Sequence, residues 1–293
     1  MDLGRVGCWQ IEFVTEAAVN VRAAAAELEE LGYGTFWYPE TLIAKESFAA
    51  GAIVLAATQS VKVATGIANL WARDAMTMAT GERTLAEAFP GRFVLGLGVS
   101  HPEQVSDHGF DYSKPLTLMR DYLDRMDSTP DMAHAPEIPA TRLLGALGPK
   151  MLGLARDRTA GAHPYLVTPE YTRRAREILG EGKLLAVEVT VVLENDADTA
   201  RRIARDFTPF YLTKANYANH MLRLGYSEDE LKDGGSDRLI DDLIAWGDVD
   251  AVTARVKEHL DAGADHVCVQ VLNESAGFPL AELRALAPSL LVL

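Results

Sequence analysis

The chain has 293 residues, of which 48% are hydrophobic and 24% are charged, and its formal net charge is −14. This composition is typical of a globular protein with ample material for a large apolar core. The negative charge repels nucleic acid and anionic membranes, and no apolar run approaches the ~20 residues of a membrane span, so we expect neither as a partner.

Short β-rich runs alternate with longer helical runs along the whole chain. Some of the β-rich runs are almost continuously apolar, such as residues 93–98, which is typical of parallel strands that are buried on both faces. We predict eight strands, at residues 5–9, 35–38, 61–67, 93–98, 141–147, 162–167, 184–193 and 266–272.

Helix start and stop signals lie between these strands. Thr15 is predicted to cap a helix that runs to Leu31 and is closed by Gly32. The other predicted helices start at Ser47, at Asp74, at Leu116, at Thr168 with Pro169 in the first turn, at Asp196 with a bend at Pro209, and at Asp248.

Eight β–α alternations over this length favour a (β/α)8 barrel, the TIM-barrel fold, over an open doubly wound sheet. The pattern shows no domain boundary, so we predict one domain over residues 1–293. Residues 100–140 and 211–246 exceed a simple βα unit and are predicted insertions after the fourth and seventh strands. Loops of that length usually cover a site or form an interface.

The cysteine content and the N-terminus indicate the compartment. Cys8 and Cys268 are too few for a disulfide framework and lack metal-ligand spacing, so we predict buried reduced thiols. No group of histidines and carboxylates has metal spacing either, and we expect no metal. The first residues lack the basic and apolar regions of a signal peptide, which predicts a cytoplasmic protein.

In such a barrel the active site lies at the C-terminal ends of the strands. Those ends carry aromatic, amide, hydroxyl and imidazole groups and little charge. The aromatic side chains are candidate substrate contacts, with packing in the core as the alternative, and the candidates are Trp9, Tyr38, Trp71 and Tyr165. Trp37 either packs in the core or forms a wall of the cofactor site.

Glu40 and His101 are the candidate catalytic residues. Glu40 follows an apolar strand and a proline, which holds its carboxylate near the mouth for acid–base chemistry, unless it pairs with a nearby arginine. His101 follows the fourth strand and either contacts a ligand or is a solvated loop side chain. It occupies the place of the third glycine in a dinucleotide fingerprint, so Gly96 and Gly98 indicate room for a flat ligand and not a Rossmann site.

The turn at residues 148–150 is a candidate anion site. Gly148 and Pro149 end an apolar run, and a helical pattern with Lys150 near its start follows at once. Free backbone N–H groups, the positive end of the helix dipole and the lysine charge all favour a phosphate there. An ordinary strand-to-helix connection is the alternative.

Four segments of the chain resemble the bacterial luciferase-like monooxygenase superfamily, and in particular its actinobacterial deazaflavin (coenzyme F420)-dependent oxidoreductases. The segments are residues 31–40, 63–67, 90–98 and 144–152, the last followed by Ala160 and Gly161. The resemblance implies a homodimeric barrel that binds a flavin-like tricycle at its mouth and transfers hydride to or from a small organic substrate. It also implies a non-prolyl cis peptide near Gly66 and Ile67.

The resemblance assigns three groups of cofactor contacts. The first is the bulge that ends the third strand, and the second is the end of the fourth strand. The third is the turn that would hold the cofactor phosphate. Together these cofactor-binding candidates are Gly66, Ile67, Ala68, Gly98, Val99, Ser100, Gly148, Pro149, Lys150 and Met151.

The chain also departs from the pattern of these enzymes. Some of them carry an Asp-His pair after the second strand, with the histidine implicated in proton transfer, where this chain has Pro39 and Glu40. The fourth-strand turn lacks the Thr-Gly-Glu of some relatives. Two alternatives therefore stay open, a monooxygenase that uses FMN and oxygen, and a non-catalytic paralogue that binds flavin or another small molecule.

Overall fold

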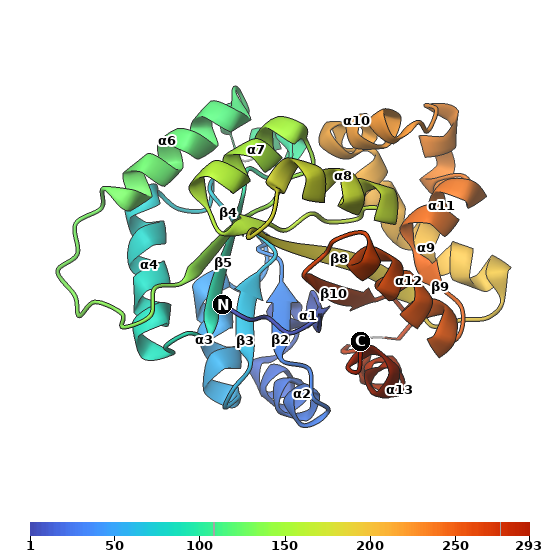
Figure 1. Cartoon of the computed structure of the whole chain (residues 1–293), viewed down its shortest axis with the longest axis horizontal. Coiled ribbons are helices and arrows are strands. Elements are labelled where there is room, and N and C mark those ends of the chain that lie inside the picture. Colours follow the sequence, from blue (N-terminus) through green and yellow to red (C-terminus); the bar gives the residue numbers. More distant parts are fainter. Residues whose placement is uncertain (108, 276) are drawn as a thin grey trace.

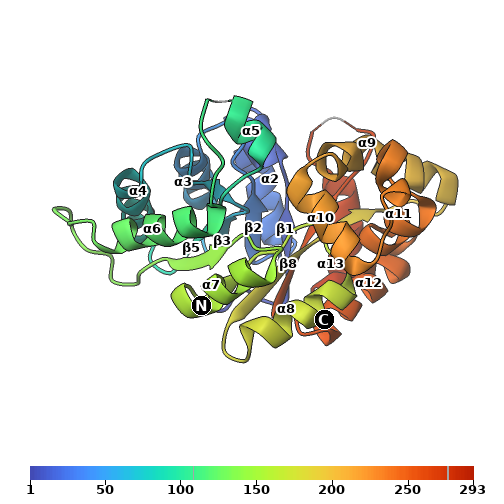
Figure 2. The ribbon, with the colours of Figure 1, turned by 90° about the horizontal axis from the view of Figure 1, so that it is seen from above.

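The computed structural model describes residues 1–107, 109–275 and 277–293. Its main strands form a closed, all-parallel barrel in the order β1, β2, β3, β5, β6, β7, β8, β10 and back to β1. Closure comes from β10, which pairs with both β1 and β8. Helices surround the barrel (Figures 1 and 2). The predicted (β/α)8 barrel is confirmed.

Most strands are short, and two of the ten do not belong to the closed barrel. The barrel strands are β1 (Val6–Trp9), β2 (Thr35–Tyr38), β3 (Lys62–Thr65), β5 (Phe93–Gly98), β6 (Thr141–Leu144), β7 (Gly161–Ala162), β8 (Leu184–Val192) and β10 (His266–Val271). The additional strand β4 (Ala68–Asn69) pairs with β5, and β9 (Ala245–Trp246) pairs with β8.

Helices of very different length lie between and after the strands. They are α1 (Glu12–Thr15), α2 (Ala18–Glu30), α3 (Ser47–Ala57), α4 (Ala75–Ala88), α5 (Pro102–Asp107), α6 (Pro115–Asp127), α7 (Pro149–Arg158), α8 (Pro169–Leu179), α9 (Ala197–Leu212), α10 (Ala215–Leu224), α11 (Asp237–Leu243), α12 (Val249–Asp261) and α13 (Leu280–Leu290), with the 3₁₀ helix η1 (Asp229–Gly234) before α11.

Most predicted helix caps are present. Asp74, Thr168, Asp196 and Asp248 each accept a hydrogen bond from a backbone N–H of the first turn of α4, α8, α9 and α12. The prediction for Thr15 is wrong. The chain forms the short helix α1 up to Thr15 and turns extended before α2, which begins three residues later without a side-chain cap.

Three predicted strands end earlier than the apolar pattern suggested. The run predicted at 141–147 ends at Leu144. The run at 61–67 breaks at the peptide bond between Gly66 and Ile67, which is cis as the resemblance implied, and continues as β4. The run at 162–167 leaves the sheet after Ala162. Pro164 has no N–H to donate, and the N–H of Leu166 donates to the side chain of Glu188 at 2.9 Å.

Both predicted insertions contain helices (Figure 2). The segment at 100–140 holds α5 and α6, and the segment at 211–246 holds α10, η1, α11 and β9. His108, within the first insertion, and Ala276 lie outside the described residues. The two segments meet, because His101 contacts Asn216 and the Ala215 N–H donates to Glu103 at 3.3 Å.

The lower barrel interior is a packed core. Trp37 is fully buried, stacks on the His163 ring with centroids 4.3 Å apart, and donates from Nε1 to His266 Nε2 at 3.0 Å. Burial lowers the pKa of both histidines to about 4, so they are neutral at pH 7. Trp37 is therefore core and not a cofactor wall. Cys8 and Cys268 are buried free thiols, as predicted.

The described residues contain neither a membrane-spanning helix nor a metal-binding cluster. Within residues 1–107, 109–275 and 277–293, no helix is long and apolar enough to cross a lipid bilayer. The same part of the chain contains no group of three or more His, Cys, Asp or Glu side chains that could hold a metal ion.

We predict that Gly161→Ala lowers the free energy of unfolding by about 1–3 kcal/mol. A Cβ at Gly161 would lie 1.8 Å from the backbone oxygen of Leu184, so β7 would have to move away from β8. The matched control is Gly153→Ala in α7, where a Cβ meets no atom within 4 Å and should stabilise the helix by about 0.5–1 kcal/mol. Urea denaturation measures both, and equal effects would contradict the prediction.

Candidate functional site

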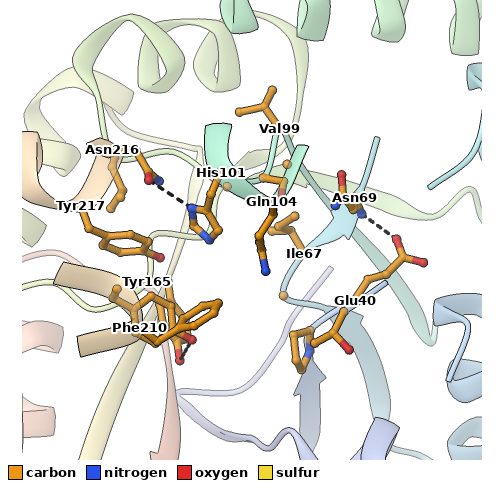
Figure 3. A pocket seen from close by; sticks show the side chains of 18 of the residues that line it. Glu40, Ile67, Asn69, Val99, His101, Gln104, Tyr165, Phe210, Asn216 and Tyr217 are labelled. Carbon is orange, nitrogen blue, oxygen red and sulfur yellow. Dashed lines mark hydrogen bonds between the residues drawn. The ribbon is translucent and has the colours of Figure 1, made fainter. Parts of the chain in front are cut away.

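A cavity of about 1030 Å³ opens at the C-terminal ends of the barrel strands (Figure 3). It collects side chains from nearly every strand end and from both insertions. The predicted site residues that line it are Trp9, Glu40, Gly66, Ile67, Gly98, Val99, Ser100, His101, Gly148, Met151 and Tyr165. The strand-end argument therefore located the cavity, although it did not determine what each residue does there.

A backbone bulge forms one side of this cavity. After β3 the chain turns at Gly66 and Ile67, and the Ile67 side chain fills space that neighbouring residues leave empty. A Cβ at Gly98 would lie 2.4 Å from Ile67 Cδ1, and one at Gly145 would lie 3.1 Å from its Cγ2. Glycine is needed at Gly98 so that Ile67 can pack there. We call the surface formed by Gly66, Ile67, Gly98 and Gly145 the glycine side of the cavity.

The N-terminus of α7 lies next to the glycine side. Gly148 is its N-cap, offers no side-chain cap to the first-turn N–H groups, and a Cβ there would meet no atom within 4 Å. Pro149 takes the first helical position, as predicted. Lys150 does not line the cavity. Its exposed side chain borders a separate depression between α6 and α7, beside Arg120.

Glu40 is held by an ion pair. Its carboxylate binds the Arg73 guanidinium through both oxygens and accepts a hydrogen bond of 2.7 Å from the Asn69 N–H, and its side chain is 3% exposed. Arg73 also pairs with Glu46 at 2.7 Å. These contacts hold the Glu40 carboxylate in place and tie β2 to the segment after β4. The structure therefore contains the arginine partner that the sequence analysis gave as the alternative to acid–base chemistry at Glu40.

His101 points into the cavity from the loop after β5 (Figure 3). Its Nδ1 lies 3.1 Å from the side-chain oxygen of Asn216 in α10. Donation from Nδ1–H to that oxygen leaves Nε2 as a lone-pair acceptor. Burial lowers the pKa of His101, while the Asn216 contact opposes the shift. At neutral pH the imidazole is therefore a neutral, oriented proton acceptor.

Aromatic rings form the opposite side of the cavity. Tyr211 of α9 is the centre, with ring centroids 5.2 Å from Tyr165, 5.1 Å from Tyr217, 4.9 Å from Phe207 and 5.1 Å from Phe210. The Tyr211 hydroxyl donates to the Tyr165 hydroxyl at 3.0 Å, and the latter donates to the side-chain oxygen of Gln270 at 2.5 Å. We call these five rings the aromatic wall.

Three of the predicted site residues lie behind the cavity. Tyr38 alternates with the inward Trp37 and points outward, where its hydroxyl donates to the Ser47 carbonyl at 2.8 Å. Trp71 packs beside Phe110 and donates from Nε1 to the Val99 carbonyl at 2.9 Å, so it supports the lining from outside. Ala68 is fully buried in β4.

The sequence interpretation missed the side chains that α9 and α10 supply. Asn216 and Tyr217 lie in the insertion that was expected to cover a site, but no motif marks them. The only available signal was the cluster of aromatic residues at 207–217, which a core helix would equally show. Only the folded chain brings this segment to the strand ends.

Comparison with known proteins gives consistent matches. A protein of Mycobacterium tuberculosis named as a coenzyme F420-dependent oxidoreductase is 25% identical over 98% of this chain and 99% of its own length. The coenzyme F420-dependent tetrahydromethanopterin reductase of Methanopyrus kandleri superposes with a TM-score of 0.78 at 16% identity, covering 100% of this chain and 99% of that one.

A second solved structure is similar over the same extent. An F420-dependent secondary alcohol dehydrogenase, in complex with an F420–acetone adduct, superposes with a TM-score of 0.76 at 14% identity, covering 99% of this chain and 98% of that one. These structural matches show a shared fold. The profile of the luciferase-like monooxygenase family matches residues 5–266, and the chain therefore belongs to the luciferase-like monooxygenase family.

Proposed function

We propose that this protein is an oxidoreductase that transfers a hydride between coenzyme F420 and a small organic substrate. The observation that carries the proposal is the combination of the glycine side with the uncapped N-terminus of α7. Gly145 contacts Ile67, and Gly148 begins the helix three residues later. A flat ring and an attached phosphate need such a pair of neighbouring surfaces. The F420-dependent relative and structural neighbours support this choice of cofactor.

The residues present fit the cofactor. Gly66, Ile67 and Gly98 would support the ring, and Val99 and Ser100 line the cavity beside them. The open space at Gly148 leaves this end of α7, with the positive end of its helix dipole, accessible to a phosphate. The bound deazaflavin would supply the hydride-carrying carbon. The protein would orient the ring, hold its phosphate and exclude water from the reacting atoms.

The proton acceptor that we propose is His101. Its Nε2 faces the cavity and its other nitrogen is held by Asn216, an arrangement in which one partner fixes the tautomer of a catalytic base. Glu40 was the other candidate. Because Arg73 and the Asn69 N–H occupy its carboxylate, we propose that Glu40 positions the bulge and does not transfer the proton.

Lys150 keeps a supporting part in the proposal. Its exposed charge, outside the cavity in the first turn of α7, would add a long-range attraction for the phosphate that salt would screen. The homodimer and the cytoplasmic location that the sequence suggested stay predictions.

Titration with F420 and with FMN tests the choice of cofactor. We expect binding to quench F420 fluorescence until the protein is saturated. The dissociation constant for FMN should be at least tenfold higher than that for F420. The turn at Gly148 would serve the phosphate of either molecule, so the ring must account for the difference. Tight binding of FMN without binding of F420 would favour the monooxygenase alternative.

Substitutions at the two acid–base candidates separate their roles. His101→Gln should lower turnover by roughly 10²–10⁴-fold, because it removes the proton acceptor but keeps a polar side chain. Glu40→Gln should keep turnover within a few-fold while weakening F420 binding. The measurement follows F420 absorbance with a panel of alcohols and carbonyl compounds. Loss of turnover in Glu40→Gln with bound cofactor, and retention in His101→Gln, would reverse the assignment.

The Asn216 contact gives a pH prediction that needs no substrate. Asn216→Leu keeps the volume but removes an acceptor that favours protonated imidazole, so the pKa of His101 should fall further below its ordinary value of 6.5. The titration midpoint of the His101 ring protons in NMR, assigned with His101→Gln, should shift to lower pH. A midpoint that rises or stays fixed would mean that Asn216 does not hold the ring.

A further inference from the structure

We propose that the aromatic wall binds an uncharged substrate that contains a ring. This inference rests on the proposed function, since it names the class of molecule that would meet the cofactor in the same cavity. It depends on three properties of the wall, namely its contiguous rings, its lack of charge, and a pair of hydrogen-bonding groups at one edge.

The wall presents ring surfaces in several orientations. Tyr165 and Tyr211 are tilted by 39°, whereas Tyr211 and Tyr217 are close to perpendicular at 74°. Ring edges and faces are therefore both available, and aromatic or flat cyclic ligands pack favourably on such a surface. Phe210 is 49% exposed, whereas Tyr165 and Tyr217 of the same wall are buried, so part of the Phe210 ring is open to a ligand.

Apolar residues also line the cavity elsewhere at its mouth. Ile11, Leu42 and Ile43 line it from the segments after β1 and β2, and Ile43 is 93% exposed. Large apolar side chains that are exposed at a cavity mouth gain about 25 cal/mol for each Å² that a ligand covers. A substrate that lies between this segment and the aromatic wall would bury both surfaces.

Charged groups are confined to the rim. Among the described lining residues, Glu40 is neutralised by Arg73, and Asp206 and Arg223 lie on exposed parts of α9 and α10. The wall itself offers rings and hydroxyl groups. A carboxylate or phosphate of a substrate would lose its hydration there without gaining an opposite charge, which is unfavourable. The wall therefore selects against charged substrates.

The size of the cavity leaves room for a small substrate beside a cofactor ring. Ligand pockets span about 300–1,000 Å³, and this cavity of about 1030 Å³ lies at the upper end of that range. A cofactor ring on the glycine side would leave the aromatic wall free. The substrate would then lie between the cofactor ring and the wall.

The polar groups at the edge of the wall indicate what the substrate carries. The Tyr217 ring lies 5.6 Å from the His101 ring, and both side chains face the same part of the cavity (Figure 3). The Tyr217 hydroxyl can donate to an oxygen, and His101 Nε2 can accept a proton from one. We therefore infer a hydroxyl or carbonyl group on the substrate ring.

Binding of three matched probes tests the substrate class. Equilibrium dialysis would measure 2-naphthol, its charged analogue 2-naphthoate, and 1-decanol, which has the same number of carbons and one hydroxyl but no ring. We expect 2-naphthol to bind at least tenfold more tightly than either of the others. Equal or tighter binding of 2-naphthoate, or of 1-decanol, would overturn the inference.

Two variants locate the binding on the wall. Phe210→Ala should weaken 2-naphthol binding roughly five- to tenfold, whereas Leu222→Ala, which removes an exposed apolar side chain of α10 outside the cavity lining, should not. Phe210→Arg should reverse the preference toward 2-naphthoate. An unchanged preference in Phe210→Arg would place the probe elsewhere and overturn the inference.

The same titrations distinguish this inference from the proposed function. Each is repeated with F420, whose own binding is measured separately. If 2-naphthol binds as expected and F420 does not bind at all, the proposed function fails and the substrate class stands. If F420 binds and 2-naphthol shows no preference over its charged or linear analogues, the substrate class fails and the proposed function stands.

Discussion

Closure of the parallel barrel is the constraint on which the rest of the structure depends. Because β10 pairs with β1 on one side and with β8 on the other, all eight barrel strands point the same way around a ring. Every strand end must then lie on one rim, and residues as far apart in the chain as Trp9 and Leu272 line the same cavity. Trp37 and its two neutral histidine neighbours pack in the interior below the rim, and the cavity lies above them.

The cavity has two unlike sides because it is built from unlike parts of the chain. The glycine side comes from the ends of β3, β5 and β6, where close backbone packing around Ile67 requires residues without a side chain. The aromatic wall comes mainly from α9 and α10, which follow β8. The glycine-containing strand ends allow the backbone to approach a ligand closely, whereas α9 and α10 place bulky aromatic rings on the opposite side of the cavity. A flat cofactor and an apolar substrate would each find a suitable surface in the same space.

Charge is distributed so that the cavity is neutral in a strongly acidic protein. Glu40 is paired with Arg73, and burial lowers the pKa of His101, so that its imidazole is neutral at pH 7. Substrate and proton acceptor would therefore meet in a poorly hydrated place where hydrogen bonds are strong. Attraction for an anion is concentrated at the N-terminus of α7, where it comes from backbone dipoles.

The barrel, most helix caps, the buried thiols and the rim that carries the cavity could all be predicted from the amino-acid sequence. These features depend on local propensity and on periodicity, which residues near one another in the chain encode. Asp74 caps α4 from the position directly before the helix, and the apolar run Phe93–Gly98 indicates a strand buried on both faces. The tertiary structure alone decided which rim residues face the cavity. Tyr38 points away and Glu40 meets Arg73 because of strand alternation and a contact across 33 residues. Asn216 and Tyr217 reach His101 only because an insertion 115 residues later folds back over the mouth, and no local pattern records such a contact.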